Sequence, residues 1–244
     1  MKLQERTYRE MTINSSQLII PRETYQRELN PERVRKIVKE FDERVANEPK
    51  VSCRNGKYYV FYHRQTNRHC YSRQACAEEI EMLPDGTFKQ AEVTSCGLNG
   101  GPLKAEGEYE ARIACHLFSK KGVYFYGGIK PPKGCHPYFT QTGKDREENG
   151  DQYIANFCDG ATAGFKYFEF QNNDKISVAV SGKACGEILV KDGLEGTMVA
   201  TIDIASGKIP QKFTAKLDIE NGVKPLYFTY RGKGRLNLLS ISFT

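Results

Sequence analysis

Short runs of alternating apolar and polar residues dominate the second half of this sequence and restrict its fold more than any other feature. Seven such runs lie between residues 164 and 243, and most are separated by Gly, Asp or Asn. They read GFKYFEF, KISVAVSG, GEILVKD, TMVATIDI, QKFTAKLDI, PLYFTYRG and LNLLSISF. Alternation with a period of two is typical of half-buried strands, and closely spaced short strands are typical of sandwiches. The sequence therefore predicts a mainly β protein that ends in an antiparallel β-sandwich.

A small α+β segment is predicted before the sandwich. Asn30-Pro31-Glu32 supplies an N-cap, a first-turn proline and an acidic residue, and apolar residues then recur at helical spacing in VRKIVKEF. This pattern predicts a helix over 31–42. Strands are expected in KYYVFYH (57–63) and on both sides of Pro84-Asp85-Gly86, a turn signal. The Gly-rich, polar residues 96–107 are interpreted as a linker or domain seam.

Charge and cysteine content exclude few classes of protein. The net charge is +6, and residues 1–64 carry +5 of it, from 14 Lys and Arg against 9 Asp and Glu. Such a mild excess favours a solvated surface over a nucleic-acid site. The charged start MKLQERTYRE lacks an apolar leader, so a cytoplasmic chain is expected, although a parent hydrolase could be extracellular. The eight cysteines contain no CxxC pair, and reduced thiols are favoured over disulfides.

The C-terminal residues resemble a family 6 carbohydrate-binding module. The likeness lies in QYIANFCDGATAGFKYFEF, ISVAVSGKACGEILVKDGLEG and GVKPLYFTYRGKGRLNLLSISF, and it extends over 104–244. It implies a jelly-roll-like, lectin-type β-sandwich that binds xylan or arabinoxylan chains without catalysis. It also implies that a structural calcium ion could be bound, without naming its ligands.

Two further resemblances divide the rest of the chain. Residues 58–103, YYVFYHRQTNRHCYSRQACAEEIEMLPDGTFKQAEVTSCGLNGGPL, look like the last propeller blade of a family 43 glycoside hydrolase, a family of arabinofuranosidases and xylosidases. Residues 1–57 resemble the start of a ParB-like nuclease domain, through IPRETYQRELNPERVRKIVKEFDERV. The two patterns meet at the NGKYYVF strand, so a chimeric junction is expected there.

The resemblance places no catalytic residue in this chain. Inverting glycosidases need two carboxylates on opposite sides of the scissile bond, and in family 43 these come from earlier blades. Hydrolase activity and DNA binding through residues 1–57 remain alternatives to carbohydrate binding.

Sugar binding requires an aromatic platform and a few hydrogen-bonding groups. The resemblance implies that Tyr153 is one platform and Asn237 a polar partner. Tyr138, Tyr167 and Tyr227 are further candidates for contact. Family members usually carry a second platform, a tryptophan, in the loop that matches ASGKIPQKF, where this chain has Ile209 and no tryptophan anywhere.

Overall fold

The computed structural model describes residues 57–68, 72–122, 135–142 and 151–244. These residues divide into two compact units. The smaller unit contains the described residues up to Tyr62 together with Ala75–Val93, and the larger one contains His63–Gln74 and the chain from Thr94 onward. The helix predicted over 31–42 lies outside the described residues. Within the described ranges, no helix has the length and apolar character needed to cross a membrane.

The hairpin strands β1 (Tyr58–Gln65) and β2 (Arg73–Ile80) pair with each other, and each contributes residues to both units. The turn predicted at Pro84-Asp85-Gly86 is present, closed by a bond of 2.7 Å from the Leu83 N–H to the Thr87 carbonyl. Its flanks meet only at one isolated bridge, so the strands expected beside it are much shorter than predicted. The Tyr62 hydroxyl donates to the buried Glu78 carboxylate at 2.9 Å, which satisfies an otherwise costly buried charge.

The larger unit is mainly β, as predicted. Its elements are η1 (Gly97–Asn99), β3 (Leu103–Lys104), β4 (Gly107–Glu110), η2 (Ala111–Ile113), β5 (His116–Phe118), β6 (Tyr138–Gln141), β7 (Gln152–Cys158), β8 (Thr162–Phe170), β9 (Lys175–Ser181), β10 (Ala184–Lys191), β11 (Met198–Ser206), β12 (Gln211–Lys216) and β13 (Gly222–Phe243).

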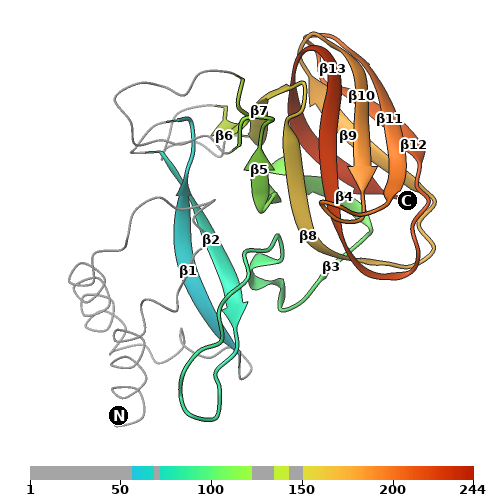
Figure 1. Cartoon of the computed structure of the whole chain (residues 1–244). Helices are drawn as coiled ribbons and strands as arrows, with labels where there is room; N and C mark the ends of the chain where they lie inside the picture. The colour runs from blue at the N-terminus through green and yellow to red at the C-terminus, as the bar shows by residue number, and fades with distance from the viewer. Residues whose placement is uncertain (1–56, 69–71, 123–134, 143–150) are drawn as a thin grey trace. The chain divides into compact units, whose positions relative to one another are not determined.

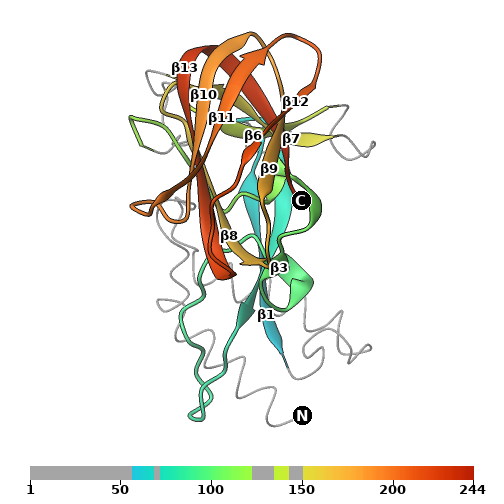
Figure 2. The ribbon, with the colours of Figure 1, turned by 90° about the vertical axis from the view of Figure 1, so that its right-hand side faces the viewer.

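These strands form two sheets that share β13. In the first sheet, the first half of β13 pairs with β10 and β8, β10 also pairs with β11, and β3 and β5 pair with β8. In the second sheet, the second half of β13 pairs with β9 on one side and with β7 and β4 on the other, while β12 and β6 extend it. Figure 2 shows β10 and β11 in one layer and β9 and β12 in the other. The predicted antiparallel sandwich is confirmed.

The two runs PLYFTYRG and LNLLSISF are one continuous strand rather than the two that the alternation suggested. Figure 1 shows this strand, β13, curving through the sandwich. The bend lies at Gly234, where φ is +85° and a Cβ atom would stand 2.1 Å from the Lys183 carbonyl oxygen. Gly182, with φ of +103°, occupies the matching corner between β9 and β10. Glycine is needed at both corners because a side chain would meet backbone there.

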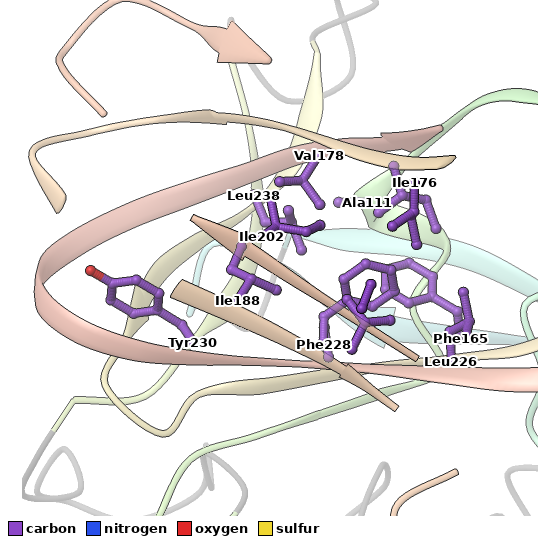
Figure 3. Close-up of a cluster of buried hydrophobic side chains, with 14 of the residues drawn as sticks. Ala111, Phe165, Ile176, Val178, Ile188, Ile202, Leu226, Phe228, Tyr230 and Leu238 are labelled. Atoms are coloured by element: carbon purple, nitrogen blue, oxygen red, sulfur yellow. The ribbon is translucent and has the colours of Figure 1, made fainter. Parts of the chain in front are cut away.

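The inner faces of the two sheets enclose one hydrophobic core. Phe165 and Phe228 pack edge to face with ring centroids 5.3 Å apart, and neither is exposed to solvent. Figure 3 shows the same cluster reaching from Phe228 in the first sheet to Val178 and Leu238 in the second. Burial of this many apolar side chains is the main stabilising term of the unit.

The Gly-rich residues 96–107 are not a bare linker. Leu103 and Lys104 pair in parallel with β8, and the Ala105 N–H donates to the Glu169 carbonyl at 2.9 Å. Ala105 is itself buried in the core of the larger unit.

The expectation of reduced thiols is wrong for one pair of cysteines. Cys135 and Cys158 form a disulfide with Cα atoms 6.5 Å apart. The pairing of β6 with β7, in which Tyr138 faces Ala155, places Cys135 directly opposite Cys158 when it is continued outward. The sequence alone does not reveal this strand register, because Cys135 and Cys158 are separated by 23 positions along the chain. The other cysteines of the described residues are not part of a disulfide: Cys76, Cys96, Cys115 and Cys185.

Candidate functional site

Three of the five predicted contact residues come from neighbouring strands of the second sheet. Tyr138 lies on β6, Tyr153 on β7 and Asn237 on β13, and β7 pairs with both of the other strands. Ile154 and Leu238 point into the core, so their alternating neighbours Tyr153 and Asn237 point away from it. We call this surface the β6–β7–β13 face and define it by Tyr138, Thr140, Tyr153, Asn156, Arg235 and Asn237.

Tyr138 and Tyr153 share the outward side of β6 and β7. Tyr153 faces Thr140 across the strands, and Tyr138 faces Ala155. Residues opposite each other in an antiparallel pair point to the same side, so both rings belong to one surface. Both side chains are half-buried, which leaves part of each ring accessible.

A β-bulge in β7 shapes the centre of this face. Leu236 faces Phe157 and Leu238 faces Ile154, so Ala155 and Asn156 together oppose Asn237. Asn156 adopts φ of +58°, a conformation that asparagine tolerates better than most residues. Bulges re-aim side chains and are frequent beside binding sites.

The side chain of Asn156 connects β7 to its surroundings. Its Nδ2 donates to the His136 carbonyl at 2.8 Å, and its Oδ1 accepts from Arg235 Nη1 at 3.2 Å. Asn237 donates through Nδ2 to Ser181 Oγ at 3.3 Å. The polar groups of the face are therefore held in place before any ligand arrives, which lowers the entropic cost of binding.

An arginine from the turn after β1 completes the face. The Arg68 guanidinium lies 4.3 Å from the centroid of the Tyr138 ring, within the distance of a cation–π contact. The Asn67 N–H beside it donates to the Phe139 carbonyl at 2.8 Å, and Thr140 Oγ1 donates to Asn67 Oδ1. Sequence reasoning missed Arg68, Asn156 and Arg235. The only available signal was that Arg235 stands two residues before Asn237 on the same strand.

Tyr167 does not belong to this group. It lies on β8, which pairs with the first half of β13 in the first sheet. Tyr227, on the first half of β13, is only 5% exposed, and its hydroxyl lies 2.9 Å from His116 Nδ1. A sugar on the β6–β7–β13 face would therefore not contact Tyr227.

Arg64, next to His63 on β1, is bound within the larger unit. Its Nε donates to Gln74 Oε1 at 2.8 Å, its Nη2 donates to the Arg112 carbonyl, and its guanidinium lies 3.6 Å from the Phe139 ring centroid. Burial, aided by the charge of Arg73, lowers the pKa of His63 below its usual range. These contacts give Arg64 a packing role beside Phe139 of β6.

No group of three His, Cys, Asp or Glu side chains that could hold a metal ion occurs among the residues whose structure is described. Calcium can also be bound by backbone and amide oxygens, so the calcium ion implied by the resemblance stays a prediction without assigned ligands.

Comparison with known proteins relates the two parts of the chain to different groups. The model of DUF6551, a family of unknown function, matches residues 20–79. The ParB-like character expected for residues 1–57 therefore stays a prediction. A xylosidase/arabinosidase of Thermoclostridium stercorarium is 42% identical over 189 residues, which are 77% of this chain and 40% of that protein. The chain thus spans about two fifths of the length of this relative.

Two solved structures are similar to parts of this chain. A family 43 arabinoxylan arabinofuranohydrolase from Bacillus subtilis, in complex with cellotetraose, matches 78% of this chain and 39% of its own, with 16% identity and a TM-score of 0.51. A family 6 carbohydrate-binding module from Clostridium cellulolyticum, in complex with xylose, matches 58% of this chain and 98% of its own, with 13% identity and a TM-score of 0.44. Over most of its length, the chain is thus similar in sequence to part of a xylosidase/arabinosidase and similar in fold to part of a family 43 hydrolase.

Proposed function

We propose that the β6–β7–β13 face binds plant cell-wall polysaccharide of the xylan or arabinoxylan type, and that this chain does so without catalysis. The observation that carries the proposal is the meeting of Tyr138, Tyr153 and Asn237 on adjacent strands of one sheet. Aromatic rings stack on the apolar face of a pyranose, and amides bond to its hydroxyl groups.

The names of two relatives support this class of sugar. A xylosidase/arabinosidase and an arabinoxylan arabinofuranohydrolase are both named for substrates that contain xylose or arabinose. This chain spans only about two fifths of either protein, with 40% and 39% covered. A part of such an enzyme that carries a sugar-facing surface would keep the enzyme on its insoluble substrate.

Affinity gel electrophoresis in arabinoxylan tests the proposal. We expect retardation of the wild-type protein, and loss of most of it in Tyr153→Ala, since one stacked ring contributes about 1–3 kcal/mol by analogy with aromatic–base stacking. Lys216→Gln is a matched control, because Lys216 is exposed at the far edge of the same sheet on β12. Equal mobility with and without xylan, arabinoxylan or arabinan would contradict the proposal.

Hydrolase activity is the second candidate, favoured by the 42% identity to a xylosidase/arabinosidase. Release of p-nitrophenol from arabinofuranoside or xyloside substrates by the purified chain would support it. The expected rate is that of buffer alone, because the resemblance assigns both catalytic carboxylates to earlier propeller blades, and residues 58–103 resemble only the end of the last one.

A further inference from the structure

Among the described residues, the β6–β7–β13 face with Arg68 carries two positive charges and no Asp or Glu. Farther along β13, on β4, Glu110 forms an ion pair with Arg112 and Glu108 accepts a hydrogen bond from Ser240 Oγ. The outward residues of the face are Tyr138, Thr140, Tyr153, Asn156, Arg235 and Asn237, and Arg68 lies over the first of them. Neither Arg68 nor Arg235 takes part in an ion pair with any residue in the described part of the chain. A neutral polysaccharide needs no such charge.

The carboxylates at the two ends of β7 do not neutralise this face. Asp159, just after β7, accepts bonds from Lys120 Nζ and from the Gly232 N–H, and the Lys120 contact holds the pKa of Asp159 below its usual range. Asp151, just before β7, is exposed at the opposite end of the strand.

Both guanidinium groups are oriented but keep free donors. The Arg68 guanidinium carbon lies 4.3 Å from the centroid of the Tyr138 ring, and a cation–π contact of this kind does not use up the N–H donors. Arg235 gives one Nη1 bond to the Asn156 amide, a neutral acceptor that does not cancel its charge. A guanidinium edge matches a carboxylate, which it binds through two parallel N–H···O bonds.

From these contacts we propose that the face selects sugars that carry a carboxylate, so that uronic acid units on a xylan-type chain are its preferred ligand. Arg68 and Arg235 bind the carboxylate, while Tyr153 stacks on a ring and Asn237 bonds to hydroxyl groups. This inference rests on the proposed function and narrows its ligand. The inference also gives the β1–β2 turn, which carries Arg68, a role in recognition. This turn lies outside the sandwich segment 104–244.

The test compares two polymers that differ only in charge. The purified full chain is run in gels that contain glucuronoxylan, or the same glucuronoxylan after its carboxyl groups have been reduced to alcohols. We expect retardation that is about fivefold stronger in the acidic polymer at low salt and that declines as salt is added. Arg68→Gln and Arg235→Gln should each remove most of this difference, Arg235→Lys should retain part of it, and Lys216→Gln should leave it unchanged.

The possible outcomes distinguish failure of the uronate preference from failure of the proposed carbohydrate binding. Equal retardation in both polymers overturns the uronate preference but leaves carbohydrate binding standing. A preference that survives both Arg→Gln variants, with circular dichroism like that of the wild type, overturns the assignment to these two arginines. Retardation in neither polymer overturns the proposed function and the inference together.

Discussion

Ile209 is 78% exposed in the loop between β11 and β12, where the family resemblance leads one to expect a second aromatic platform. This loop lies beside the β6–β7–β13 face. The Gly182 N–H donates to the Gly207 carbonyl at 2.7 Å, and Ser181, which precedes Gly182, accepts the bond from Asn237. An aromatic side chain at position 209 would thus stand near the polar end of the site.

We predict that Ile209→Trp strengthens binding to arabinoxylan by about 1–3 kcal/mol, the value of one stacked aromatic contact. Isothermal titration with xylo-oligosaccharides measures the change. Ile209→Ala is the control and should leave the affinity within about twofold, because an exposed aliphatic side chain contributes little. A Trp variant that folds like the wild type but binds no better would place the ligand away from this loop.

Single residues of the site differ in how far the sequence could predict them. Tyr153 and Asn237 could be proposed from the sequence because each lies inside a segment that resembles a carbohydrate-binding module. Arg68 and Asn156 were not, since their positions depend on the docking of a turn onto β6 and on a bulge. Both features are set by tertiary register, which a local sequence pattern does not encode.

At the scale of elements, the bend of β13 depends on Gly234. A Cβ atom there would lie 2.1 Å from the Lys183 carbonyl oxygen, and φ of +85° is unfavourable for alanine. We predict that Gly234→Ala lowers the free energy of unfolding by about 2–4 kcal/mol, the sum of conformational strain and overpacking. Urea denaturation measures the loss.

Gly207→Ala is the matched control for the corner, since a Cβ atom at position 207 has nothing within 4 Å. Its stability should equal or slightly exceed that of the wild type, because alanine restricts the unfolded chain. If Gly234→Ala were equally neutral, β13 would not need glycine to pass from one sheet to the other.

The disulfide is the second element-scale feature with a measurable consequence. Cys135–Cys158 closes a loop that contains β6 and β7, the strands that carry Tyr138 and Tyr153. For a sequence separation of 23, the loop-entropy model gives a stabilisation of about 3 kcal/mol. We predict that Cys135→Ser/Cys158→Ser loses about that much stability in urea denaturation and also binds sugar more weakly.

Cys185→Ser, which removes an exposed thiol outside the disulfide, should leave both properties unchanged. Identical stability of the double variant and the wild type under non-reducing conditions would show that the two cysteines are not joined. Disulfides persist mainly in oxidising compartments. The location expected from the first residues stays a prediction.

For the whole molecule, the sequence was most informative where alternation and turn residues agree. The mainly β character and the antiparallel sandwich follow from that agreement and are confirmed. The boundaries of the strands were harder to predict from the sequence. The segment Gly232-Lys233-Gly234 has the composition of a turn, yet hydrogen bonds to β10 keep it inside β13 and only the strand direction changes. The predicted boundaries at 57 and 103 stay predictions.

Binding should also be visible in the stability of the molecule as a whole, because a ligand that binds only the native state stabilises it by mass action. At an oligosaccharide concentration ten times Kd, the gain is about 1.4 kcal/mol. For a unit of this size, that gain corresponds to a rise in Tm of about 3–6 °C, measured by calorimetry with xylohexaose. Tyr153→Ala should unfold near the wild-type temperature without ligand and show almost no rise with it, since Tyr153 is half-buried on the outward face and does not fill the core. An equal rise in this variant would mean that the sugar is held elsewhere on the sandwich.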